Sequence, residues 1–174
     1  MSKHVRKPYV SVDFRGKGHT HGTIDPKVVV LHDTESSDKK GVRDISGVLN
    51  YLYDTPDELN VHICVDKEGY SGQGAKLTDL CYHAKGANSF SIGIEMIGYA
   101  RFSMKVWAAR RKQIDTVAKW LAYIHWRFDI PLVLSTTHGI ARHSDFPAGG
   151  HEDPGMFPMG YVLKKARKYA KTGW

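Results

Sequence analysis

The sequence predicts an α/β domain in which helices flank a mixed central β-sheet, and three observations lead to that prediction. Short β-branched runs, which are typical of buried strands, recur along the chain. Two longer segments place their apolar residues at the spacing of one helix face. The segments follow one another as strand, helix, two strands, strand, long helix, strand and helix. Such alternation is typical of a sheet whose faces are covered by helices.

The length and composition of the chain indicate how many domains it forms and which classes of protein are excluded. The chain has 174 residues, of which 41% are hydrophobic and 25% charged, and this suits one compact domain. We expect a single domain over residues 1–174, with residues 1–26 as an irregular polar arm. We expect no membrane span, because the apolar runs are short, and no secretory signal, because the first residues are polar. Cys64 and Cys81 form no paired motif, and we interpret both as reduced, buried thiols.

The first half of the chain contributes one helix and three strands. Residues 28–34, VVVLHDT, predict a buried strand that ends near His32. Residues 59–74 predict a strand, a turn at residues 67–69 and a second strand. Residues 41–55 predict an amphipathic helix, whose buried face comprises Ile45, Val48, Leu49 and Leu52.

The second half begins with a strand predicted over residues 89–100. By alternation Ile92, Ile94 and Met96 share one face, and the other face takes Ser91, Gly93, Glu95 and Ile97. One long helix is predicted over residues 105–128, ended by Pro131, with a buried stripe of Ile114, Val117, Leu121, Ile124 and Phe128. A further strand is predicted over residues 132–137, and a basic helix closes the chain.

Residues 136–155, TTHGIARHSDFPAGGHEDPG, form a glycine-rich loop that carries candidate metal ligands. A catalytic zinc site takes about three ligands from His, Asp, Glu or Cys and leaves a position open for water. His32 at a strand end is one candidate, although such histidines are often structural. The loop offers His138, His143, Asp145, His151 and Asp153. Spacing alone does not choose between His138 and His143.

Three motifs together resemble a known enzyme family. VVVLHDT, HAKGANSFSIGIEMIG at residues 83–98 and HSDFPAGGHEDPG at residues 143–155 are similar to motifs of the zinc-dependent N-acetylmuramoyl-L-alanine amidases. That family includes phage endolysins, bacterial anhydromuropeptide amidases and animal peptidoglycan recognition proteins. The resemblance covers most of the chain and implies one amidase catalytic domain with the peptidoglycan-recognition-protein fold. It also implies a Zn²⁺ ion bound by His32, His143 and Asp153.

The resemblance assigns further roles near the metal. Glu95, in SIGIE, matches a glutamate that acts as general base. Phage enzymes that use a tyrosine instead carry it where this chain has Val61. Most members place an oxyanion-stabilising lysine two residues before the third ligand, where this chain has His151. His151 is therefore expected to stabilise the oxyanion, with a fourth zinc ligand as the alternative.

Two more residues are expected at the substrate groove. His83 matches a family position that lines this groove, and Asn88 is either a substrate contact or a turn former. His62 is expected to orient neighbouring groups or fill the core, whereas His138 and His125 are expected to be structural or to contact the ligands from outside the site. Asp145 is expected to brace the loop.

The net charge of +7 indicates a polyanionic partner, or simply a solvated face on the last helix. With the resemblance, the expected partner is peptidoglycan, and nucleic acid, suggested only by charge, is not expected. The implied reaction is hydrolysis of the amide bond between N-acetylmuramic acid and L-alanine. We expect a monomeric phage endolysin, made in the host cytoplasm and released to the wall through a membrane lesion. The alternatives are a cytoplasmic muropeptide-recycling amidase, a zinc peptidase that cuts the stem peptide and a binding module without activity.

Overall fold

The computed structural model describes residues 4–39 and 41–174 and contains a six-stranded mixed sheet in the order β1-β4-β3-β5-β2-β6. The central strands are β2 (Val28–Asp33) and β5 (Ser91–Met96), which run parallel to each other. β6 (Gly139–Arg142) and β3 (Ile63–Val65) extend the parallel part on either side. β4 (Ser71–Gln73) runs antiparallel to β3, and β1 (Val12–Asp13) lies at the edge. The predicted fold class, a mixed sheet flanked by helices, is confirmed.

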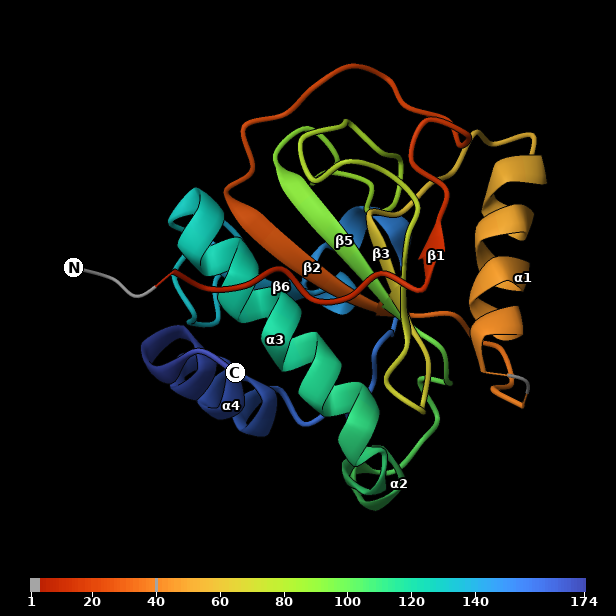
Figure 1. The fold of residues 1–174 in the computed structure, drawn as a ribbon. Helices are drawn as coiled ribbons and strands as arrows, with labels where there is room; N and C mark the ends of the chain where they lie inside the picture. The colour runs from red at the N-terminus through yellow and green to blue at the C-terminus, as the bar shows by residue number, and fades with distance from the viewer. Residues whose placement is uncertain (1–3, 40) are drawn as a thin grey trace.

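Helices lie on both sides of this sheet (Figure 1). α3 (Arg111–Phe128) and α4 (Met159–Thr172) lie side by side across one face. Their apolar residues form the main core with alternate residues of the central strands, Val29, Leu31, Ile92 and Ile94. α1 (Val42–Asp54) covers part of the opposite face and packs Ile45 and Leu49 near Cys64. The predicted faces of α1 and of the strand at residues 89–100 are therefore confirmed.

The long helix predicted over residues 105–128 is wrong in one respect, because two helices occupy this segment. α2 (Met104–Ala109) ends before Arg110, whose backbone leaves the helical region with φ −82° and ψ 54°. The guanidinium group of Arg110 donates to the carbonyl oxygen of Ile97 at 2.7 Å and to Gln113 at 2.9 Å. The hydrogen bond to Ile97 is a tertiary contact at the break between the helices, and the spacing of apolar residues does not reveal it.

The strand predicted over residues 132–137 is also wrong. This segment makes one isolated bridge, between Leu134 and Ile140, and the side chains of Val133 and Leu134 are exposed. The strand that joins the sheet is β6, which pairs its residues Gly139 to Arg142 with β2 from Val28 to Leu31. The β-branched residues lie in the segment 132–137, but the hydrogen bonds to β2 begin at Gly139, seven residues after the start of that segment.

The N-terminal arm is more ordered than the predicted irregular segment. β1 pairs in parallel with β4, joining Val12 to Gly72. Val5 is buried, and Lys7 donates to Gln73 at 2.7 Å. The arm therefore completes one edge of the sheet.

The two cysteines are as expected. Cys64 and Cys81 are free and buried, and burial raises the pKa of the Cys81 thiol to about 12. Among the residues that the structure describes, no helix combines the length and apolar character needed to cross a membrane.

Candidate metal centre

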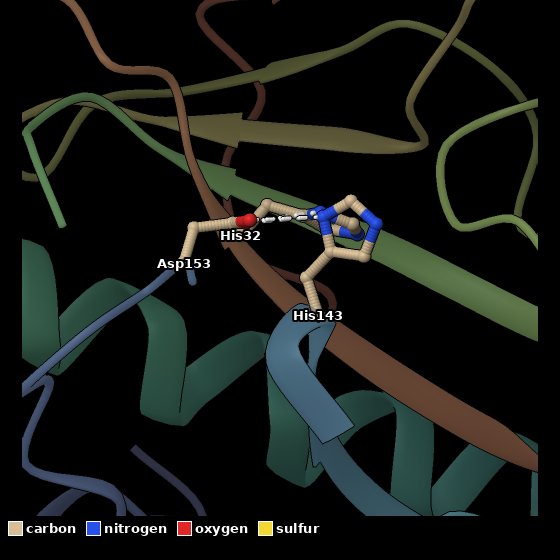
Figure 2. Close-up of side chains that lie close together, drawn as sticks. All are labelled: His32, His143 and Asp153. Atoms are coloured by element: carbon tan, nitrogen blue, oxygen red, sulfur yellow. Dashed lines mark hydrogen bonds and ion pairs between the residues drawn. The ribbon is translucent and has the colours of Figure 1, made fainter. Parts of the chain in front are cut away.

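Three side chains from distant parts of the chain meet at the carboxyl ends of β2 and β6 (Figure 2). His32 is the fifth residue of β2, His143 follows β6 directly, and Asp153 closes the loop after it. One ligand atom of each lies within 4.8 Å of the others, and all three residues are buried. The structure thus brings together the three residues predicted as ligands at the strand ends, where sites gather in α/β folds.

The carboxylate of Asp153 lies between the two imidazole rings. Its Oδ1 is 3.0 Å from Nδ1 of His143, and its Oδ2 is 3.4 Å from Nδ1 of His32. Burial alone would raise the pKa of Asp153, but the hydrogen bond from His143 holds it well below its usual range. The backbone N–H of Ser144 donates to the carbonyl oxygen of Asp153 at 3.0 Å, which fixes the carboxylate beside His143.

A chain of hydrogen bonds decides which ring nitrogen of His32 carries its proton. Nε2 of His32 lies 3.0 Å from Nδ1 of His83. Nε2 of His83 lies 3.3 Å from the carbonyl oxygen of Ser91 and 3.2 Å from its hydroxyl, which itself donates to Ala87. Both oxygens accept here, so Nε2 of His83 carries a proton and its Nδ1 accepts. His32 therefore donates from Nε2.

This assignment lets the three residues be tested for their fit to a metal ion. Burial lowers the pKa of His32, which favours the neutral ring, and the hydrogen bond to His83 places its single proton on Nε2. Its Nδ1 lone pair then faces the ionised carboxylate of Asp153, and two acceptors oppose each other without a hydrogen between them. A cation relieves that arrangement, and two imidazoles with one carboxylate are a donor set that zinc prefers. The residues fit the ion.

Glu95 lies on the strand next to His32, with which it is in register. Its Oε2 is buried and has no hydrogen-bond partner within the described chain. Burial, and then the charges of Asp153 and Asp33, raise the pKa of Glu95 well above its usual range. A carboxyl group with an unpartnered oxygen beside a candidate metal site is placed for proton transfer.

His151 lies on the open side of the cluster. Its ring stacks on that of His143 with a centroid distance of 3.9 Å, and its side chain is 50% exposed. Nδ1 of His151 is 3.9 Å from Oδ1 of Asp153. Among the described residues it is not one of the group whose ligand atoms lie within 4.8 Å of one another.

A family comparison adds a decisive observation to this geometry. Residues 22–156 match the model of a family described as N-acetylmuramoyl-L-alanine amidase, Amidase_2. The chain belongs to the N-acetylmuramoyl-L-alanine amidase family. Because this is a family of amidases, the chain is an enzyme, and the predicted family is confirmed. A comparison with curated protein sequences returns no match.

Solved structures share the fold of the amidase at low sequence identity. The endolysin N-acetylmuramoyl-L-alanine amidase LysCS from Clostridium intestinale has a TM-score of 0.68 at 17% identity, covering 93% of this chain and 97% of that one. PGRP-SA from Apis mellifera has a TM-score of 0.69 at 16% identity, over 88% and 94%. AmpD, solved as a selenomethionine derivative, has a TM-score of 0.68 at 15% identity, over 94% and 97%.

The candidate metal centre of the amidase opens into a cleft of about 1100 Å³. One wall is α1, with Arg43, Val48 and Tyr51, and the other is the segment from Tyr82 to Asn88. The floor holds the three candidate ligands together with Glu95. The aromatic and charged walls had no signal in the sequence, because only the fold brings α1 opposite this segment.

The two residues expected to contact substrate line this cleft but are engaged within the protein. Both ring nitrogens of His83 have protein partners, and burial lowers the pKa of His83 well below its usual range. Oδ1 of Asn88 accepts from the backbone N–H groups of His83 and Ala84, at 3.0 and 2.7 Å. Asn88 thus stabilises a turn, which is one of the two roles expected for it from the sequence.

The remaining candidates of the amidase lie apart from the metal centre or support it. His62 accepts from the N–H of Gly93 at 2.9 Å and contacts the carbonyl oxygen of Asp79, and its pKa is lowered by burial to about 4. His138 is exposed, and Asp145 accepts from the N–H of Arg142 within the loop. Asp33, which the sequence did not single out, lines the cleft beside His32, and burial raises its pKa to about 7.

Proposed function

We propose that the chain is a zinc-dependent N-acetylmuramoyl-L-alanine amidase that cuts between N-acetylmuramic acid and L-alanine of peptidoglycan. The single observation that carries the proposal is the buried cluster of His32, His143 and Asp153 beside the unpartnered carboxyl oxygen of Glu95. Zinc, when bound by these three residues, would supply Lewis-acid activation of a water molecule and of the scissile carbonyl. Residues 1–174 act in this proposal as one monomeric catalytic domain.

Glu95 moves the proton in this reaction. It accepts a proton from the attacking water as the water oxygen bonds to the lactyl carbonyl carbon. It then gives that proton to the alanine nitrogen as the carbon–nitrogen bond breaks. The support is its place next to His32 in register, its free Oε2 and its position in the floor of the cleft.

His151 donates an N–H to the carbonyl oxygen as negative charge develops on it. Its ring is half exposed and stacked on His143, so the ring edge is available to substrate at the mouth of the centre. A donor already oriented toward a developing oxyanion stabilises the transition state more than the substrate. His83 and Asn88 complete the substrate-side wall, through the shape of the segment on which they lie.

Hydrolysis of purified peptidoglycan tests the proposal. We expect new L-alanine amino groups and peptide-free glycan strands, both abolished by a chelator and restored by zinc. Glu95→Gln is expected to lose about 100-fold or more in rate while it still binds zinc. The exposed glutamate variant Glu58→Gln serves as the matched control and retains full activity. Full activity after removal of zinc, or in Glu95→Gln, contradicts the proposal.

The same experiment distinguishes a zinc peptidase, which would use the same ligands on a different bond. That enzyme would release stem-peptide fragments whose new N-termini belong to residues after L-alanine. Mass spectrometry of the products separates the two reactions.

For the biological role we propose a phage endolysin that is made in the host cytoplasm and reaches the wall through a membrane lesion. The net charge of +7 suits an insoluble wall that carries carboxylates and anionic polymers. The alternative, a cytoplasmic recycling amidase, acts on soluble anhydromuropeptides. Clearing of intact cell walls, weakened by added salt, supports the endolysin, whereas activity only on soluble fragments supports the alternative.

A further inference from the structure

We propose that His83 is a positioning residue of the metal centre, which sets the metal affinity by accepting the Nε2 proton of His32. This inference rests on the proposed zinc site. It gives His83 a role other than contact with substrate, because neither of its ring nitrogens is left for a ligand in the cleft.

The proton positions follow from an oxygen that accepts and cannot donate. The carbonyl oxygen of Ser91 lies 3.3 Å from Nε2 of His83, and the hydroxyl hydrogen of Ser91 is already donated to the carbonyl of Ala87 at 2.8 Å. His83 must therefore present a lone pair from Nδ1, 3.0 Å from Nε2 of His32. The backbone of β5 in this way directs the Nδ1 lone pair of His32 toward Asp153.

The surroundings hold the His83 ring in this orientation. A Cβ atom on Gly93 would lie 2.8 Å from both Cγ and Nδ1 of His83, so the ring packs directly on the backbone of β5. In addition, Oδ1 of Asn88 accepts from the backbone N–H of His83. His62, itself held by the N–H of Gly93, meets the His83 ring edge to face at 5.5 Å.

Without the acceptor on His83, the His32 ring has another way to satisfy its proton. It moves the proton to Nδ1 and donates to Oδ2 of Asp153, 3.4 Å away. That tautomer occupies the lone pair that a metal needs and also engages the carboxylate. Hydrogen bonds of this kind to metal-binding histidines are worth about 10- to 100-fold in metal affinity.

The test measures zinc dissociation constants by competition with a chromophoric chelator. His83→Phe keeps the ring and removes the acceptor, and we expect it to weaken zinc binding about 10- to 100-fold. His83→Asn places an oxygen where Nδ1 lies, and we expect it to restore most of that affinity. His125→Phe makes the same chemical change at the end of α3, where His125 contacts the carbonyl of Ile130, and is expected to bind zinc like the unaltered chain.

Melting curves of the zinc-free variants show whether each one is folded. Nitrogen NMR of the His32 ring in the zinc-free, unaltered chain adds a readout that needs no variant, and we expect the proton on Nε2. A proton on Nδ1, or a folded His83→Phe variant that binds zinc within about twofold of the unaltered chain, overturns the role of His83 and leaves the zinc site standing. Failure of the unaltered chain to bind zinc overturns the proposed function and the inference together.

Discussion

The two faces of β2 and β5 differ in role, because one packs in the apolar core and the other lines the cleft. Both faces are made of alternate residues of the same strands. Toward α3 and α4 the strands present Val29, Leu31, Ile92 and Ile94, all fully buried in the main core. Toward the cleft they present His32 and Glu95. Because successive side chains of a strand point to opposite faces, neighbouring residues can lie in the apolar core and in a reactive site. The comparison predicts that substitutions on one face alter stability and those on the other alter activity.

The largest expected effect is in the cleft, at the candidate metal centre that His32 shares with His143. His143→Ala removes one of three candidate ligands, and we expect at least about a 1000-fold loss of kcat/KM on peptidoglycan, equivalent to about 4 kcal/mol of activation free energy. His138→Ala changes an exposed histidine five residues earlier and serves as the control, with activity unchanged. Equal activities of the two variants would remove His143 from the metal centre.

On the core face, Ile94→Ala is expected to lower the free energy of unfolding by about 3 kcal/mol. Ile94 is fully buried among apolar side chains, and truncation leaves a cavity that the core fills only in part. The kcat/KM of the folded fraction stays close to that of the unaltered chain. Urea unfolding and assays below the transition check both statements, with exposed Met104→Ala as control. Loss of activity without loss of stability would break the comparison.

A smaller effect is expected at Asp66, which directly follows β3 and lies near Gly41 at the start of α1. Burial, and the charge of Asp38 nearby, raise the pKa of Asp66 from 3.8 to about 6 in the folded chain. The folded state thus holds the proton of Asp66 up to a higher pH than the unfolded state, so ionised Asp66 lowers stability above pH 6 and this cost is absent below about pH 4.

Asp66→Asn removes this cost and keeps an oxygen that accepts from Tyr70. We expect the variant to be about 2 kcal/mol more stable than the unaltered chain at pH 8, with little difference at pH 4. Urea unfolding at both pH values measures the change, and the exposed Asp57→Asn provides the control. A gain of equal size at both pH values would mean that ionisation of Asp66 is not its cause.

The sequence predicted those parts of the molecule that depend on local periodicity or on short motifs. Alternation in SIGIE placed Ile94 and Glu95 on opposite faces, as the packing confirms. The motif resemblance selected His143 over His138, and the structure brings His143 to His32 and leaves His138 exposed. Spacing alone offered no such choice, since convergence of the two segments depends on β2 and β6 being neighbours.

Features that depend on distant partners were missed. The break at Arg110 coincides with its hydrogen bond to Ile97, and the position of β6 results from its register with β2. The interaction between His32 and His83 joins residues 51 positions apart and has no periodic signal. Local sequence patterns do not encode which carbonyl oxygen a buried histidine will meet.

The loop between His143 and Asp153 is closed at its base by the backbone hydrogen bond from Ser144 to Asp153. Residues 147–150, beyond that closure, are exposed to solvent. Extending a surface loop costs little free energy, because the entropy of closure grows only slowly with length. This segment is therefore a place where the enzyme can accept inserted residues, and with them new contacts to peptidoglycan, while the two candidate ligands keep their positions.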